Sequence, residues 1–187
     1  MIFWMIAVSL LKLWPQKRWK KIVLTTLLVL LLAGAIAIAY VFLSINKDVV
    51  SPIDVVNPGG VKAALVVYQP GLTSAPRDNA YDFGNGLASS GWRVEITTAS
   101  PKAPSDLSNY SLLVIAFPIY GGAPGTAADR YVDRLGNLQG IHMVIIDVPS
   151  LETIMRQKVE AKNGTVLATL VADGTTNIRQ AGSQIAP

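Results

Sequence analysis

Residues 112–122 read LLVIAFPIYGG, and the rest of the fold can be worked out from this stretch. Its first five residues, 112–116, are apolar and uncharged, which is typical of a strand buried on both faces of a sheet. In the turn 117–122, Pro118 keeps the residue before it extended, and two glycines let a ligand approach the backbone closely. Ligands of open α/β sheets bind beyond the carboxyl ends of the strands, so this turn predicts a binding loop.

Other apolar stretches alternate with segments of helical periodicity. We expect further strands at 63–68, 92–98, 141–147 and 165–171, and helices at 76–90, 127–135 and 149–162. Strands that alternate with helices predict the α/β class, here a three-layer sandwich with a five-stranded parallel sheet. The alternating pattern of 92–98 predicts an edge strand. The polar residues after 173 have room for little more than one helical turn, which predicts a sheet face that is exposed or covered by a partner.

The amino-terminal part contains a stretch of membrane length. Residues 22–45 carry no charge over 24 positions. At about 1.5 Å per residue, such a helix spans a hydrocarbon core of about 30 Å. It is also longer than the roughly 7–15 apolar residues of a signal peptide. We therefore expect a retained single-pass transmembrane helix with the lipid bilayer as its partner.

The charges that flank this stretch predict its orientation. Five positive residues precede it and only Lys47 closely follows it. The positive-inside bias places the amino terminus in the cytoplasm and the folded domain outside the cytoplasm. Residues 1–14 are also apolar but too short to span, so we expect them to lie in the interface. A hairpin of two membrane segments is the alternative, and it would reverse the topology.

The formal charge of +4 belongs to the amino-terminal segment and not to the folded part. Residues 51–187 hold ten basic and eleven acidic residues. That part has no basic stripe of the kind that a phosphate backbone requires, which argues against nucleic-acid binding. The absence of Cys excludes disulfides and thiolate chemistry, and a single histidine, His142, argues against a histidine-built metal site. We assign no catalytic residue and no metal ligand.

These patterns divide the chain into four parts. Residues 1–21 form a basic, partly amphipathic segment, and 22–45 form the transmembrane helix. Residues 46–60 mix polar residues with Pro and Gly and read as a linker that ends in the turn NPGG. Residues 61–187 form the α/β domain.

Within that domain, the part from 61 to 171 resembles the flavodoxin family. The sequence Pro118-Ile119-Tyr120-Gly121-Gly122 matches the Pro-x-Tyr-Gly-Gly loop that many members place after the third strand, where it holds the flavin isoalloxazine ring. Members also place a hydroxyl-rich phosphate loop after the first strand. Here that loop reads Thr73-Ser74-Ala75-Pro76, which keeps two hydroxyls but lacks the usual Gly-Asn-Thr.

The resemblance implies a non-covalently bound FMN and the residues that would hold it. These are Thr73, Ser74, Ala75 and Arg77 near the phosphate, and Phe117, Pro118, Tyr120, Gly121 and Gly122 near the ring. A helix N-terminus presents unpaired N–H groups, so a phosphate fits there without a dedicated cation. Arg77 either adds a charge-assisted contact or is a solvated helix residue. Tyr120 either stacks on the flavin or packs on its own domain.

Two functions from different classes remain open at this stage. The first is a membrane-anchored flavodoxin-like protein that binds FMN and transfers electrons, either as a carrier or as an FMN-dependent oxidoreductase with an unknown redox partner. The second is a flavin-free interaction module or accessory subunit of a membrane complex. The intact Pro-x-Tyr-Gly-Gly favours the first function, and the altered phosphate loop favours the second.

Overall fold

The computed structural model describes residues 17–120, 123–124, 126–147, 152–172 and 176–186. The chain divides into two compact units, Met1–Ser44 and Ile45–Pro187, and we describe each by itself.

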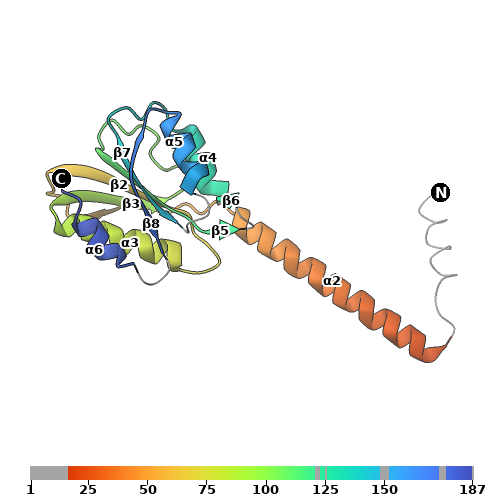
Figure 1. Ribbon diagram of the computed structural model, residues 1–187. Coiled ribbons are helices and arrows are strands. Elements are labelled where there is room, and N and C mark those ends of the chain that lie inside the picture. Colours follow the sequence, from red (N-terminus) through yellow and green to blue (C-terminus); the bar gives the residue numbers. More distant parts are fainter. Residues whose placement is uncertain (1–16, 121–122, 125, 148–151, 173–175, 187) are drawn as a thin grey trace. The chain divides into compact units, whose positions relative to one another are not determined.

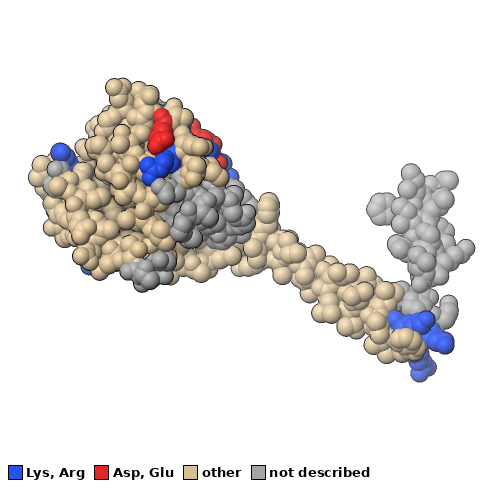
Figure 2. All heavy atoms as spheres, in the orientation of Figure 1, with Lys and Arg blue, Asp and Glu red and all other residues tan. Residues whose placement is uncertain are grey.

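The first unit contains most of one long helix, α2 (Arg18–Asn46), of 29 residues. Its apolar side chains are exposed along its length. The part Arg18–Ser44 is long and apolar enough to cross a membrane, and no other helix in the described part of the chain has that character. Figure 2 shows that the charges of this helix gather at its amino end, where Arg18, Lys20 and Lys21 lie.

The second unit is built on a six-stranded sheet in the order β1-β3-β2-β4-β7-β8. Five strands are parallel: β2 (Lys62–Tyr68), β3 (Trp92–Thr98), β4 (Leu112–Ala116), β7 (His142–Asp147) and β8 (Thr165–Val171). The sixth, β1 (Asp54–Val56), pairs antiparallel with β3. The five expected strands are present and parallel, but the prediction of a purely parallel five-stranded sheet is wrong because β1 adds a sixth, antiparallel strand, and β3 is not an edge strand. A strand of three residues is too short to show a periodic pattern in the sequence.

The segment before β1 is fixed to the domain by polar contacts. We call residues 47–53, which precede β1, the stalk. The Thr98 backbone N–H donates to Ser51 Oγ at 3.1 Å, and the Ser51 N–H donates to Thr98 Oγ1 at 3.0 Å. Asp48 forms an ion pair with Arg130. Part of the stretch predicted as a linker, 46–60, is thus ordered against the sheet.

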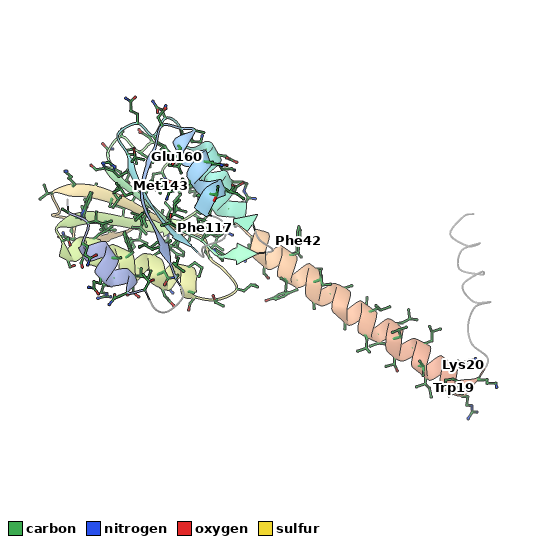
Figure 3. All side chains as sticks on the ribbon, viewed as in Figure 1. Trp19, Lys20, Phe42, Phe117, Met143 and Glu160 are labelled. Atoms are coloured by element: carbon green, nitrogen blue, oxygen red, sulfur yellow. The ribbon has the colours of Figure 1, made fainter. Side chains whose placement is uncertain are left out.

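Helices cover both faces of the sheet, as the three-layer prediction requires (Figure 1). α4 (Thr126–Arg134) and α5 (Glu152–Glu160) cover one face, and α3 (Ala75–Ser89) and α6 (Ile178–Ser183) cover the other. Successive residues of each central strand point to opposite faces, so each strand contributes to two separate cores. Phe117 and Met143 lie in the core under α4 and α5 (Figure 3).

The short helix α6 packs closely against α3. A Cβ added at Gly86 would lie 2.1 Å from the Arg179 carbonyl oxygen, and one at Gly182 would lie 2.4 Å from the Phe83 oxygen. The Trp92 indole N–H also donates to the Ile185 carbonyl at 2.9 Å. The sheet face that we expected to be exposed or covered by a partner is therefore covered in part by α6. This helix of six residues can pack against the backbone of α3 because the two glycines have no side chains in the contact.

Candidate functional site

The strand order places a crevice at the carboxyl ends of β2 and β4. If the five parallel strands are numbered by their order in the sequence, they lie side by side in the sheet in the order 2-1-3-4-5. The chain leaves β2 for a helix on one face and leaves β4 for a helix on the other face. The two connections therefore diverge, and ligands of open α/β sheets bind at such a switch point.

A pocket of about 160 Å³ lies at this edge of the sheet. The start of α3 contributes Thr73, Ala75, Pro76 and Asn79 to its wall. The ends of three strands contribute Ala116, Phe117, Pro118, Ile146 and Ala172. The structure thus brings together four of the residues expected near a flavin, Thr73, Ala75, Phe117 and Pro118, from two segments that are about 40 residues apart in the sequence.

Five of the lining residues were not among the residues expected to hold FMN: Pro76, Asn79, Ala116, Ile146 and Ala172. Asn79 lies one helical turn after Ala75, so the 3.6-residue period alone places both on one face of α3. Ile146 and Ala172 are at or just beyond the ends of β7 and β8. Their position at strand ends was the available signal, because the carboxyl ends of parallel strands meet at one edge of the sheet.

Phe117 has a second role that the sequence did not indicate. Only 4% of its surface is exposed, and it belongs to the core under α4 and α5. It lines the pocket while it anchors the end of β4. Its contribution to the site is therefore inseparable from the packing of the domain.

Ser74 and Arg77 face a different surface from Thr73's pocket. Both line a neighbouring open groove, the stalk groove, whose wall includes Val49, Ile53 and Tyr68. Thr73 touches both spaces. Ser74 and Arg77 are not among the described residues that line the pocket of Thr73, Ala75, Phe117 and Pro118.

Tyr81 is part of the wall of the stalk groove. The Arg77 guanidinium lies 5.5 Å from the centroid of the Tyr81 ring. The Tyr81 hydroxyl donates to an Asp54 carboxylate oxygen at 3.1 Å. Burial raises the pKa of Tyr81, and the hydrogen bond to Asp54 raises it further. Tyr81 is therefore a neutral hydrogen-bond donor at physiological pH.

The expected ring-binding residues lie mostly outside the described structure. Tyr120 belongs to β5 (Ile119–Tyr120), which pairs with β6 (Ala123–Pro124) in a small hairpin after β4. Gly121 and Gly122 fall outside the described residues, as does the side chain of Tyr120. The flavin-stacking role of this loop stays a prediction.

The electrostatics of the pocket suit an anion at the start of α3. The Ser74 side chain makes no capping hydrogen bond, so it does not occupy the N–H groups of the first turn. No carboxylate is among the described residues that line the pocket. The lining therefore presents the positive end of a helix, the Thr73 hydroxyl and the Asn79 amide, which fits a phosphate group.

Gln69 ties the two loops of the crevice together. It follows β2 directly, and its side-chain oxygen accepts a hydrogen bond from the Ala128 backbone N–H at 2.8 Å. Its own backbone N–H donates to the Ala116 carbonyl at 2.8 Å. One buried residue thus holds the end of β4 and the first turn of α4 beside the end of β2.

No protein-family model matches this sequence, and no curated protein matches it. Solved structures match its fold at low identity. Two-electron reduced flavodoxin from Megasphaera elsdenii gives a TM-score of 0.56 at 16% identity, over 65% of this chain and 96% of that one. A Streptococcus pneumonia TIGR4 flavodoxin gives 0.55 at 15% identity, over 64% and 92%. An NAD(P)H:quinone oxidoreductase from Methanothermobacter marburgensis gives 0.53 at 13% identity, over 66% and 98%. The domain therefore has a flavodoxin-like fold, as the sequence motifs predicted.

Proposed function

We propose that this protein is a membrane-anchored flavoprotein that binds FMN non-covalently and transfers electrons. The observation that carries the proposal is the pocket at the switch point between β2 and β4, where the start of α3 meets Phe117 and Pro118. In this fold that edge is where a flavin would bind. The names of the similar structures, two flavodoxins and a quinone oxidoreductase, are consistent with such a role.

Different residues of the pocket would hold different parts of the cofactor. Thr73, Asn79 and the first turn of α3 would hold the phosphate, and Pro118 with the loop after it would approach the ring. Ile146 and Ala172 are apolar and would exclude water from the inner wall of the pocket. The redox chemistry belongs to the flavin when it is bound, and the protein supplies position and electrostatics.

A flavin-free interaction module is the second candidate function. The pocket of about 160 Å³ is smaller than the roughly 300–1,000 Å³ of typical ligand sites, and Pro76 removes one N–H from the helix start. Fold alone does not choose between the two candidates. Titration of the purified protein with FMN and with riboflavin separates the two candidates. If neither flavin binds saturably, the interaction module is the candidate that remains.

Replacing Thr73 with Ala tests the phosphate end of the site. Hydrogen bonds to charged groups contribute about 1.5–3 kcal/mol, so FMN affinity should fall about tenfold or more. Riboflavin lacks the phosphate, and its affinity should stay unchanged. Ser74→Ala is the matched control, because Ser74 lines the stalk groove and should change FMN affinity less. Equal losses for both flavins would mean that Thr73 does not contact a phosphate.

Membrane attachment is expected to depend on the amino-terminal helix alone. Deletion of residues 1–44 removes the one helix of the described chain that could cross a bilayer and leaves both cores of the domain intact. The truncated protein should remain in the supernatant after high-salt washing and ultracentrifugation, whereas the full chain should pellet with membranes. Sedimentation of the truncated protein with membranes would contradict the single-anchor proposal.

The proposed topology has the amino terminus in the cytoplasm and the domain outside it. Lys12, Lys17, Arg18, Lys20 and Lys21 precede the charge-free stretch and should be retained on the cytoplasmic side. Protease added to intact protoplasts should therefore digest the domain. Protection in protoplasts with digestion in inverted vesicles would reverse the assignment.

A further inference from the structure

The stalk groove is bordered by exposed apolar side chains from two separate segments. Val49 and Ile53 come from the stalk and are 39% and 44% exposed. Leu72 lies in the loop after β2, between the groove residues Pro70 and Thr73, and is 54% exposed. Val49 and Ile53 thus line one open space of about 610 Å³ at the carboxyl edge of the sheet, and Leu72 belongs to the loop that supplies part of its other wall. Contiguous exposed apolar surface marks interaction sites.

The charges of this groove compensate one another. Arg77 and Asp54 are its charged lining residues in the described structure, and both contact Tyr81 between them. Because one cation and one anion lie on either side of the same tyrosine, the described lining of the groove has no net charge that would attract a strongly charged partner. The groove therefore favours a partner whose contact surface is apolar.

We propose that the stalk groove and Leu72 form a surface that docks on the lipid bilayer. The inference rests on the membrane anchoring proposed above. Val49 follows the charge-free stretch 22–45 by four residues, and each residue extends the chain by at most about 3.6 Å. When that stretch spans a bilayer, Val49 is within about 15 Å of chain from its end, so it can lie in or just outside the interfacial region, which is about 5–8 Å thick on each side.

The order of the stalk makes this docking specific to one face of the domain. The ion pair of Asp48 with Arg130 and the hydrogen bonds of Ser51 with Thr98 hold the stalk along the ends of the strands. Because these contacts fix the stalk to the domain, Val49 and Ile53 keep their places in the groove. Val49, Ile53 and Leu72 consequently meet the lipid together, and the gain comes from the removal of their apolar surface from water.

Single spin labels on the full chain test this surface. The chain has no Cys, so Leu72→Cys, Val61→Cys and Ile36→Cys each give one labelling site. Val61 is 85% exposed and directly precedes β2, at the amino ends of the parallel strands and so at the opposite end from the groove. It is the matched control. Ile36 lies in α2 and reports the anchor itself. Each labelled protein is reconstituted in phosphatidylcholine vesicles, and collisions with lipid-soluble oxygen and with a water-soluble nickel complex are measured.

The proposal expects the label at 72 to collide mainly with oxygen, as the label at 36 does, while the label at 61 collides mainly with nickel. The difference should persist in molar salt, because the groove has no net charge to screen. A label at 72 that behaves like the one at 61 overturns the docking surface and leaves the anchor intact. A label at 72 shielded from both probes means a protein contact and also overturns it. A label at 36 that faces water overturns the anchor and the docking surface together.

Discussion

Gly86→Ala is expected to destabilise the domain by about 3 kcal/mol, the upper end of what overpacking costs. Gly to Ala in a helix interior normally stabilises by roughly 0.5–1 kcal/mol, so the expected sign is opposite to helix propensity. The reason is the contact with α6, where the added Cβ would lie 2.1 Å from the Arg179 carbonyl oxygen. A backbone atom cannot rotate away, so α6 has to shift.

The measurement is thermal unfolding of residues 45–187. A loss of about 3 kcal/mol lowers the melting temperature of a domain of this size by about 10 °C. In this fragment Trp92 is the only tryptophan, and its indole N–H donates to the Ile185 carbonyl just after α6. Its fluorescence therefore reports whether α6 has moved.

Two other Gly→Ala variants serve as controls, because their added Cβ atoms meet less rigid neighbours or none. Gly84→Ala, in the same helix, meets the Ile96 Cδ1 atom at 2.8 Å, which is the mobile end of a side chain, so its loss should be smaller. Gly136→Ala meets nothing within 4 Å and should be neutral or slightly stabilising. Equal behaviour of all three variants would mean that α3 and α6 do not depend on backbone contact.

The sequence predicted the parallel strands better than the edges of the sheet. β4 and β8 begin and end where expected, because uncharged apolar runs between turn residues leave little choice of boundary. β1 was missed because three residues cannot show a period, and its position depends on pairing with β3, about 40 residues further along the chain. The contact of α6 depends on Gly86 and Gly182 lying opposite each other, which is a tertiary relation that no local pattern reports.

The candidate site was predicted in part for a similar reason. The resemblance to flavodoxins pointed to Thr73, Ala75, Phe117 and Pro118, and it could be mapped onto this chain because strand ends and helix starts are local features of a sequence. The sequence could not predict which space Arg77 borders, because the stalk forms the other wall of that space and its packing against the domain is a tertiary feature.

The second large effect is expected from Ala75→Trp, which should lower FMN affinity by about 100-fold or more, or about 2.7 kcal/mol. Ala75 begins α3 and lines the pocket of about 160 Å³ at the phosphate end of the proposed site. An indole there occupies the space that the phosphate requires. Ala75 is itself exposed and belongs to neither core, so the fold should survive the substitution.

Val61→Trp is the matched control for this variant. It places the same side chain at an exposed position before β2, at the far edge of the sheet, and should leave FMN affinity unchanged. Circular dichroism of both variants checks that the fold is kept, and fluorescence titration with FMN gives the affinities. Because the indole fills the phosphate end, riboflavin should lose less affinity than FMN in Ala75→Trp. Native FMN affinity in a folded Ala75→Trp protein would show that the cofactor does not bind between α3 and the end of β4.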